Sequence, residues 1–270
     1  MLVLIKHRLI KIIEKLPLFQ IFIYNNLQYF KFLFPHDKDY YALKILFKKN
    51  ETRAFLDIGG NIGLSTIGFR ELGFKKNKII MFEPDKLLIH RYVNKIKKNY
   101  SKIIVYPFGL SNKTQKKKLF RAFYKNIFFH FNNSFNLKYL KDKLKHNYGA
   151  RAKKFRIKST ILELKKFDNL NLKEKICFIK IDVEGFDEYV IYGMKKFLKK
   201  NSPVILVEYN RSNFLKIFSF LKKKYDCYFY DFKNNNLKKL SVHLIQKLKN
   251  GKILENIFKK NSVNLFFIRR

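Results

Sequence analysis

The chain has 270 residues and a mass of 32.7 kDa, and 59 Lys and Arg against 20 Asp and Glu give a formal net charge of +39. Hydrophobic residues make up 47% of it, with 30 Phe and 16 Tyr, which excludes an intrinsically disordered chain. The two cysteines, Cys177 and Cys227, exclude a disulfide scaffold, and their apolar neighbours predict buried thiols in a reducing compartment.

The charge is mostly lysine, with 49 Lys and 10 Arg. A protein that reads bases or holds phosphates bidentately favours Arg, so this bias weakens a nucleic-acid function without removing it. The charge is also uneven: residues 111–175 carry 19 basic and 4 acidic residues, whereas residues 176–210 carry five of each. Acidic residues are rare in this basic chain, so their concentration in residues 176–210 indicates a candidate site.

We expect residues 1–50 to form a basic, helical N-terminal extension, because Leu2, Ile5, Leu9 and Ile12 recur at helical spacing between lysines. We expect neither a bilayer-spanning stretch of about 20 apolar residues nor a secretory signal here. The helix is expected to pack on the rest of the protein. A peripheral contact of residues 1–20 with the inner membrane face is the alternative, and the expected location is cytoplasmic.

Residues 51–270 alternate apolar strands with helices. Expected strands, in chain order, are 54–58, 79–82, 103–106, 176–181, 204–207, 227–230 and 263–268, and expected helices lie at 64–72, up to Asn99, at 187–200 and at 214–224. Continuous apolar strands between helices predict an α/β fold with a doubly wound, mostly parallel sheet.

The span 111–175 interrupts this alternation and is predicted to be an insertion. It has two β-rich pieces, at 118–124 and 155–162, on either side of an Asn-rich, polar stretch at 130–149 that we expect to be irregular.

A glycine-rich turn, Asp57-Ile58-Gly59-Gly60-Asn61-Ile62-Gly63, joins the first strand to its helix, where open α/β sheets bind nucleotides. Its G-G-x-x-G spacing differs from the G-x-G-x-x-G of dinucleotide folds, and Asp57 would repel a pyrophosphate. A carboxylate here suits S-adenosylmethionine, which carries an ammonium and a sulfonium. Glu83 ends the second strand, where an acid accepts both ribose hydroxyls. A glycine turn without a ligand is the alternative.

The acids at the end of the fourth strand form a second candidate cluster. Asp182 and Glu184 directly follow the buried run 176–181, and strand alternation points both to the same side. The start of a helix explains Asp187 and Glu188, because helix N-termini favour acids. It does not explain Asp182 and Glu184, which we interpret as site residues beside the ligand crevice.

Three ordered blocks of the chain resemble the FkbM family of S-adenosylmethionine-dependent methyltransferases. They are Phe55 to Gly63, Phe82 to Pro84 and Ile179 to Gly185, and the match continues through Val190 to Gly193 and Val204 to Glu208, covering residues 53–210. The resemblance implies a class I, Rossmann-like methyltransferase domain over residues 51–270, with a seven-stranded sheet whose last strand is antiparallel. It also implies O-methylation, commonly of sugars in polysaccharides or of secondary metabolites.

The departures from the family pattern are mild: Gly60 replaces the usual Ala, Asp187 the usual Glu, and Leu162-Glu163 the usual Leu-Asp. None of them touches the four acids of the predicted site.

Methyl transfer is an in-line displacement, so positioning carries most of the catalysis. We expect the amino-acid end of the donor at Asp57, Gly59, Asn61 and Gly63, the ribose at Glu83, and the adenine beside Phe108-Gly109-Leu110.

A sugar hydroxyl needs a base or a metal to take its proton. Asp182 and Glu184 are the candidates; Asp182 is alternatively a cofactor contact, and His130 is an alternative base. Lys180 is interpreted as a strand residue. The remaining histidines are interpreted as surface or packing residues: His7, His36, His90, His146 and His243. No zinc-ligand pattern is present, so no metal is expected.

The expected function is therefore an O-methyltransferase acting on a glycan or glycosylated small molecule. An RNA methyltransferase is the alternative, suggested by the basic insertion and the aromatic residues. A non-catalytic basic module, binding membrane or nucleic acid on a relic nucleotide fold, is a third hypothesis, against which the intact acid pattern argues.

Overall fold

The computed structural model describes Phe22, Asn26 and residues 35–125, 127–130, 132–183, 185–209, 213–241 and 264–270. The helix expected near the N-terminus, and with it the predicted membrane contact of residues 1–20, lies outside the described residues. The described chain divides into two compact units. The core unit contains residues 35–115 and 163–270, and the inserted unit contains residues 116–162.

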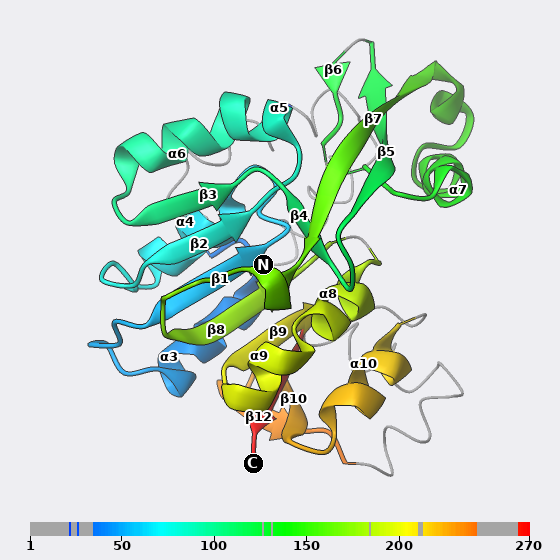
Figure 1. The fold of residues 1–270 in the computed structure, drawn as a ribbon. Helices are drawn as coiled ribbons and strands as arrows, with labels where there is room; N and C mark the ends of the chain where they lie inside the picture. Colours follow the sequence, from blue (N-terminus) through cyan, green and yellow to red (C-terminus); the bar gives the residue numbers. More distant parts are fainter. Residues whose placement is uncertain are drawn as a thin grey trace. The chain divides into compact units, whose positions relative to one another are not determined.

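The core unit is built on one sheet with the strand order β11-β10-β12-β9-β8-β1-β2-β3 (Figure 1). Its strands are β1 (Ala54–Ile58), β2 (Ile79–Phe82), β3 (Ile103–Tyr106), β8 (Ile176–Ile181), β9 (Val204–Glu208), β10 (Tyr225–Asp231), β11 (Asn236–Lys239) and β12 (Asn264–Arg269). The five strands β3, β2, β1, β8 and β9 pair in parallel. Every residue of β1, β2 and β8 is buried, as expected for strands covered on both faces. The predicted α/β fold is confirmed.

The predicted count of seven strands, with only the last antiparallel, is wrong. Among the described residues this sheet has eight strands, because β11 adds a further antiparallel strand at the edge, next to β10. The last strand, β12, pairs antiparallel with β9 and β10, as predicted. Three of the four side chains of β11 are exposed, so no apolar run marks it in the sequence. Ion pairs Lys238–Asp231 and Lys239–Asp226 hold this polar edge to β10.

Helices cover both faces of the sheet (Figure 1). One face packs against η3 (Lys38–Ala42), α3 (Leu43–Leu46), α4 (Leu64–Glu71) and α6 (Asn94–Asn99), and the other against α8 (Asp187–Gly193), α9 (Lys195–Lys200) and α10 (Phe214–Leu221). The helix expected up to Asn99 consists of α5 (Lys86–Leu88), the π-helical turn η4 (Ile89–Val93) and α6.

An aromatic cluster fixes the first helix to the sheet. The rings of Phe55 on β1, Phe69 on α4 and Phe178 on β8 are fully buried, and their centroids lie 5.1, 5.6 and 5.7 Å apart. Edge-to-face contacts of this kind add to the free energy of burial. They hold β1, β8 and α4 rigidly where the glycine turn leaves the sheet.

The inserted unit is a small sheet packed on one helix. It contains β5 (Gln115–Tyr124), β6 (Ile127–Phe128), α7 (Leu137–Tyr148), the 3-10 turn η5 (Gly149–Lys154) and most of β7 (Phe155–Lys166). The last residues of β7 pair in parallel with β4 (Gly109–Ser111) in the core unit, and η6 (Phe167–Asn169) follows.

The prediction that residues 130–149 are irregular is wrong, because α7 occupies most of this stretch. Its apolar stripe is one residue wide: Leu140, Leu144 and Tyr148 are buried at four-residue spacing among lysines and asparagines. They pack with Ala122 and Phe129, among others, in a core that shares no described residue with the core unit.

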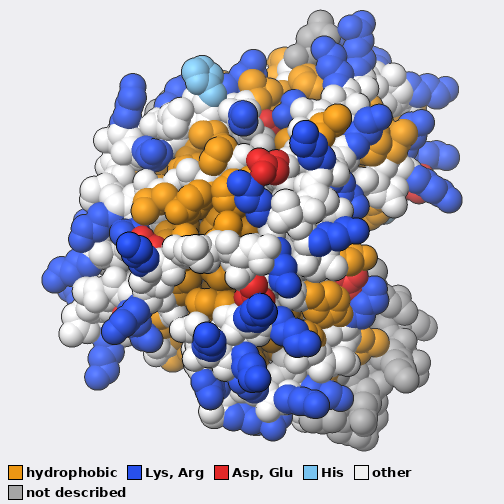
Figure 2. All heavy atoms as spheres, viewed as in Figure 1, with side chains coloured by type: hydrophobic (Ala, Val, Ile, Leu, Met, Phe, Trp, Pro, Cys, Tyr) orange, Lys and Arg blue, Asp and Glu red, His pale blue; other side chains and the backbone are white. Residues whose placement is uncertain are grey.

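Lysine and arginine side chains are spread over the face of the molecule in Figure 2, with few acids between them. The imbalance is greatest in the inserted unit, where residues 116–162 carry 14 basic residues and a single acid, Asp142. Both cysteines are free and buried, as predicted. None of the helices that the structure describes is long and apolar enough to cross a membrane.

Candidate active site

The glycine turn lies where β1, β2 and β8 end. Its Gly59 and Gly60 amides donate to the Phe82 carbonyl oxygen at 3.0 and 3.3 Å. Gly59 has a φ of +80°, and a Cβ there would lie 1.9 Å from the Asp182 carbonyl oxygen. Only glycine fits at this position, because both the conformation and the close approach to β8 exclude a side chain. The turn is therefore fixed between the ends of β2 and β8.

Gly60, which replaces the usual family alanine, has a different reason to be small. A Cβ there would lie 2.4 Å from Cγ and 2.5 Å from Sδ of the buried Met81 side chain on β2. The methionine fills the space that a methyl group at position 60 would occupy, so the two residues are sterically coupled.

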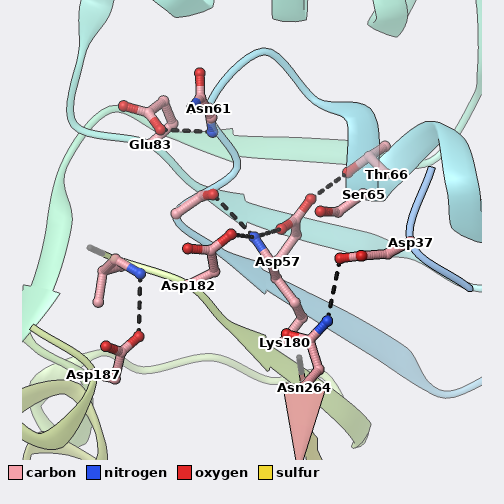
Figure 3. A network of polar contacts seen from close by, with 12 residues as sticks. Asp37, Asp57, Asn61, Ser65, Thr66, Glu83, Lys180, Asp182, Asp187 and Asn264 are labelled. Carbon is pink, nitrogen blue, oxygen red and sulfur yellow. Dashed lines mark hydrogen bonds and ion pairs between the residues drawn. The ribbon is translucent and has the colours of Figure 1, made fainter. Parts of the chain in front are cut away.

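A buried lysine links the ends of β1 and β8 (Figure 3). Lys180 Nζ donates to the Gly59 carbonyl oxygen at 3.2 Å and forms ion pairs with Asp182 at 3.2 Å and Asp57 at 3.6 Å. Burial alone would lower the pKa of Lys180, but the charges of Asp182 and Asp57 outweigh it and raise that pKa. Lys180 is thus a permanent ammonium directly beneath the turn.

Asp57 has no exposed surface. Its Oδ2 accepts a hydrogen bond from Thr66 Oγ1 at 2.8 Å, and its Oδ1 faces Lys180. The carboxylate therefore joins the start of α4 to β8, since Thr66 lies in the first turn of that helix.

Glu83 follows β2 and is almost fully buried. Its Oε2 accepts from the Asn61 amide at 2.7 Å and its Oε1 from the Asp85 amide at 2.8 Å, so it holds the glycine turn from the β2 side. Burial raises the pKa of Glu83 to about 7, against the hydrogen bonds from the two amides. Both protonation states are consequently populated near neutral pH.

Asp182 is the accessible acid of the cluster, with 42% of its side chain exposed. Behind it, Asp187 accepts from the Val183 amide at 3.2 Å and from Asn213 Nδ2 at 3.1 Å. Burial, and then the neighbouring Asp182 charge, raise the pKa of Asp187 to about 6. Asp187 thus shapes the turn that carries Asp182.

The other predicted site residues are placed as follows. Phe108 is buried beside Phe82 and Tyr106, with Lys165 Nζ 4.4 Å from its ring centroid, and Gly109 begins β4. His130 belongs to the inserted unit, where burial lowers its pKa to about 3. Glu184 lies outside the described residues.

The profile of the Methyltransferase FkbM domain matches residues 57–228, which include the glycine turn, Glu83 and the Lys180 cluster. The chain belongs to the FkbM methyltransferase family. The resemblance seen in the sequence is thereby confirmed. The solved structure of a methyltransferase FkbM from Methylobacillus flagellatus KT is similar, with a TM-score of 0.51 and 15% identity over 86% of this chain and 48% of that one. The chain thus spans about half the length of that protein.

Two further solved structures are more distant. The plantazolicin methyltransferase BpumL, in complex with SAH, has a TM-score of 0.40 and 13% identity over 100% of both chains. Precorrin-6y C5,15-methyltransferase from Geobacter metallireducens GS-15 has a TM-score of 0.35 and 11% identity over 81% of this chain and 79% of that one. No curated protein matches the chain significantly.

One residue of the buried cluster, Lys180, is not assigned to the site by the sequence analysis. Lys180 is a residue of β8, as the sequence predicts, but a lysine inside the fully buried strand Ile-Cys-Phe-Ile-Lys-Ile is itself a signal, because a buried ammonium requires partners. His36, interpreted as a surface or packing residue, is exposed and packs against the Tyr40 ring with a centroid distance of 5.5 Å. Among the described residues, no group of three or more His, Cys, Asp or Glu side chains is arranged to hold a metal ion.

Proposed function

We propose that the protein transfers a methyl group from S-adenosylmethionine to a hydroxyl of a sugar, polysaccharide or secondary-metabolite acceptor. The domain responsible spans residues 51–270, with the insertion at 111–175, and the expected setting is polysaccharide biosynthesis in the cytoplasm. Membership of the FkbM family supports the reaction type. The bound donor supplies an electrophilic methyl group on a sulfonium.

The observation that carries the proposal is the Glu83 carboxyl, buried at the end of β2 against the glycine turn. Ribose hydroxyls are hydrogen-bond donors, and a carboxylate fixed by two backbone amides has lone pairs left to accept them. The residues present fit S-adenosylmethionine: Glu83 holds the ribose, and the turn that contains Gly59, Asn61 and Gly63 receives the amino-acid end. Phe108 and Gly109 border the adenine.

Asp57 serves this donor site through its neighbours. Since its carboxylate has no exposed surface and already holds Thr66 and Lys180, it positions the turn and supports the donor ammonium by its charge. Asp182 is the exposed member of the cluster, so it is assigned to orienting the acceptor hydroxyl. Glu184, two residues later in the sequence, is the second proposed catalytic acid.

Calorimetric titration with S-adenosylmethionine and its demethylated product tests the donor site. We expect wild type to bind both ligands and Glu83→Ala to lose at least tenfold in affinity, because about 1.4 kcal/mol is lost with even one strong hydrogen bond. Glu163→Gln removes a carboxylate whose side chain is 52% exposed and serves as the matched control. No binding to wild type, or equal binding to Glu83→Ala, refutes the donor site.

The acceptor class is tested with a labelled methyl donor and a cell extract separated into glycan, small-molecule, lipid, RNA and protein fractions. The proposal expects label in the glycan or small-molecule fraction. Label confined to protein or lipid contradicts it.

The inserted unit gives a specific reason to keep RNA as a second acceptor, since it carries 14 basic residues against one acid. Binding of RNA by such a surface releases counterions, so log affinity falls with log salt at a slope of several units. Label in the RNA fraction together with that slope favours an RNA methyltransferase, and a flat salt response excludes it.

A further inference from the structure

The contact made by Asp187 is unusual for an acid at the start of a helix. Helix α8 begins at Asp187 and its N-cap is Phe186. A capping acid accepts from amides that follow it in the helix, whereas Asp187 Oδ1 accepts from the earlier Val183 amide at 3.2 Å (Figure 3). Val183 stands between Asp182 and Glu184 in the sequence. Asp187 is therefore attached to the segment that carries both proposed catalytic acids.

Asn213 holds the other oxygen of the Asp187 carboxylate. It directly precedes α10, is 3% exposed, and donates from Nδ2 to Asp187 Oδ2 at 3.1 Å. The two helices also share one hydrophobic core, to which Val190 of α8 and Phe214 of α10 both belong. Two hydrogen bonds in series therefore connect the start of α10, through Asp187, to the Val183 amide.

The link between Asp187 and Asn213 is made by hydrogen bonds. Asp187 is 2% exposed, and in the described part of the chain its carboxylate forms no ion pair with Lys or Arg. The adjacent charged residues of the two helices, Glu188 and Lys216, pair with each other at 3.1 Å. Asn213 Oδ1 is buried and accepts no hydrogen bond from the described residues. Since an amide can present either its oxygen or its nitrogen, Asn213 can also accept from a donor at position 187.

We propose that Asp187 and Asn213 are positioning residues for methyl transfer: through the Val183 amide, they fix the backbone from which Asp182 and Glu184 act on the acceptor hydroxyl. This rests on the proposed function. An in-line displacement depends on the placement of the attacking oxygen, and a misplacement of about 1 Å can reduce the rate about 100-fold. The pair therefore acts on the rate of transfer, through the placement of the two acids.

The donor site has supports of its own. Glu83 holds the glycine turn from the β2 side through the Asn61 amide at 2.7 Å. The Asp182 amide donates to the Ile58 carbonyl oxygen at 3.1 Å, so the end of β8 stays attached to β1 when the Val183 contact is lost. Removing the link between Asp187 and Asn213 should therefore disturb the acceptor and leave the donor bound.

The first test needs no acceptor and combines hydrogen exchange of the full chain with calorimetry. In Asn213→Leu, peptides that cover residues 182–186 are expected to exchange at least about tenfold faster, while affinity for S-adenosylmethionine changes less than about threefold. Asn77→Leu is the matched control. Asn77 is also buried, donates from Nδ2 to the Arg53 carbonyl oxygen at 2.7 Å and has an unpaired buried Oδ1, but it precedes β2, at the opposite end of the strand from the glycine turn. Unchanged exchange in Asn213→Leu, or an equal effect of the two variants on residues 182–186, overturns the proposal.

The second test measures transfer to the extract fraction that takes up label. Asp187→Leu and Asn213→Leu are expected to lower kcat at least about tenfold, with the apparent KM for that fraction changed less than about threefold. Asp187→Asn keeps an acceptor for the Val183 amide and a partner for Asn213, so kcat should stay within about threefold of wild type. A loss in Asp187→Asn as large as in Asp187→Leu would assign the effect to charge and overturn the proposal.

An exchange of the two side chains tests their direct contact. Asn213→Asp alone brings two carboxylates together and should lower kcat at least about tenfold. Adding Asp187→Asn restores one amide facing one carboxylate and should return kcat to within about threefold of wild type. Full kcat in both leucine variants, or no recovery on exchange, refutes the positioning role. Absence of donor binding in wild type instead refutes the proposed function itself.

Discussion

Removing the Lys180 ammonium tests how the site is held together. In Lys180→Met, the fully buried Asp57 keeps only its hydrogen bond from Thr66, so a charge is left without compensation. Breaking a buried ion pair in this way costs about 3–5 kcal/mol, a large part of the 5–15 kcal/mol that stabilises a typical domain. The Asp182 pair adds at most about 1 kcal/mol, because that side chain is 42% exposed.

The assay is urea unfolding followed by hydrogen exchange of peptides from β1 and β8, which reports on the core unit. Lys78→Met removes an ion pair with Glu174 that is more exposed than the Lys180–Asp57 pair, and it should lower the free energy of unfolding by less than about 1 kcal/mol. Adding Asp57→Asn to Lys180→Met should recover at least about 1 kcal/mol, since the isosteric amide removes the uncompensated charge. A loss below 1 kcal/mol for Lys180→Met, or no recovery in the double variant, refutes the reasoning.

Three further predictions concern the turn and its supports. Gly59→Ala should lower the free energy of unfolding in urea by more than about 4 kcal/mol and abolish donor binding, because the added methyl group would clash with the Asp182 backbone and residue 59 has a positive φ. A stable variant that binds the donor contradicts this. Since the pKa of Glu83 is raised to about 7 from 4.5, its contribution to stability is complete below pH 4.5 and is lost as pH rises through 7. The free energy of unfolding should thus fall by about 3 kcal/mol between pH 4.5 and pH 7, and Glu83→Gln should reduce this dependence on pH. The same dependence on pH in the variant argues against a buried acid at this position. Gly60→Ala should lower the free energy of unfolding by about 1–3 kcal/mol. In a double-mutant cycle with Met81→Ala, the two substitutions together should be at least about 1 kcal/mol less destabilising than the sum of the single effects. Simple additivity would show that the two side chains do not compete for space.

The parallel half of the sheet could be predicted because its strands are uninterrupted apolar runs, and burial on both faces is what produces that pattern. The glycine turn, Glu83 and Asp182 were identifiable for a related reason. Each follows such a run directly, and the carboxyl ends of neighbouring parallel strands meet at one edge.

Features that depend on distant or polar partners could not be predicted. Strand β11 has almost no buried side chain, and α7 buries a stripe only one residue wide, so neither gives a clear hydrophobic period. The segment around Asp37 and Asp39 is held by Asn264, more than 200 residues later in the chain. Such contacts are products of the folded topology and have no local signature.

The separate hydrophobic core of the inserted unit has a consequence for how the protein can change. Residues 116–162 can lose their packing without disturbing the apolar contacts of the main sheet, so heating should give two transitions instead of a single cooperative one. The same independence makes the segment exchangeable. Another module can replace it between Gln115 and Glu163 while β4 and the end of β7 keep their pairing.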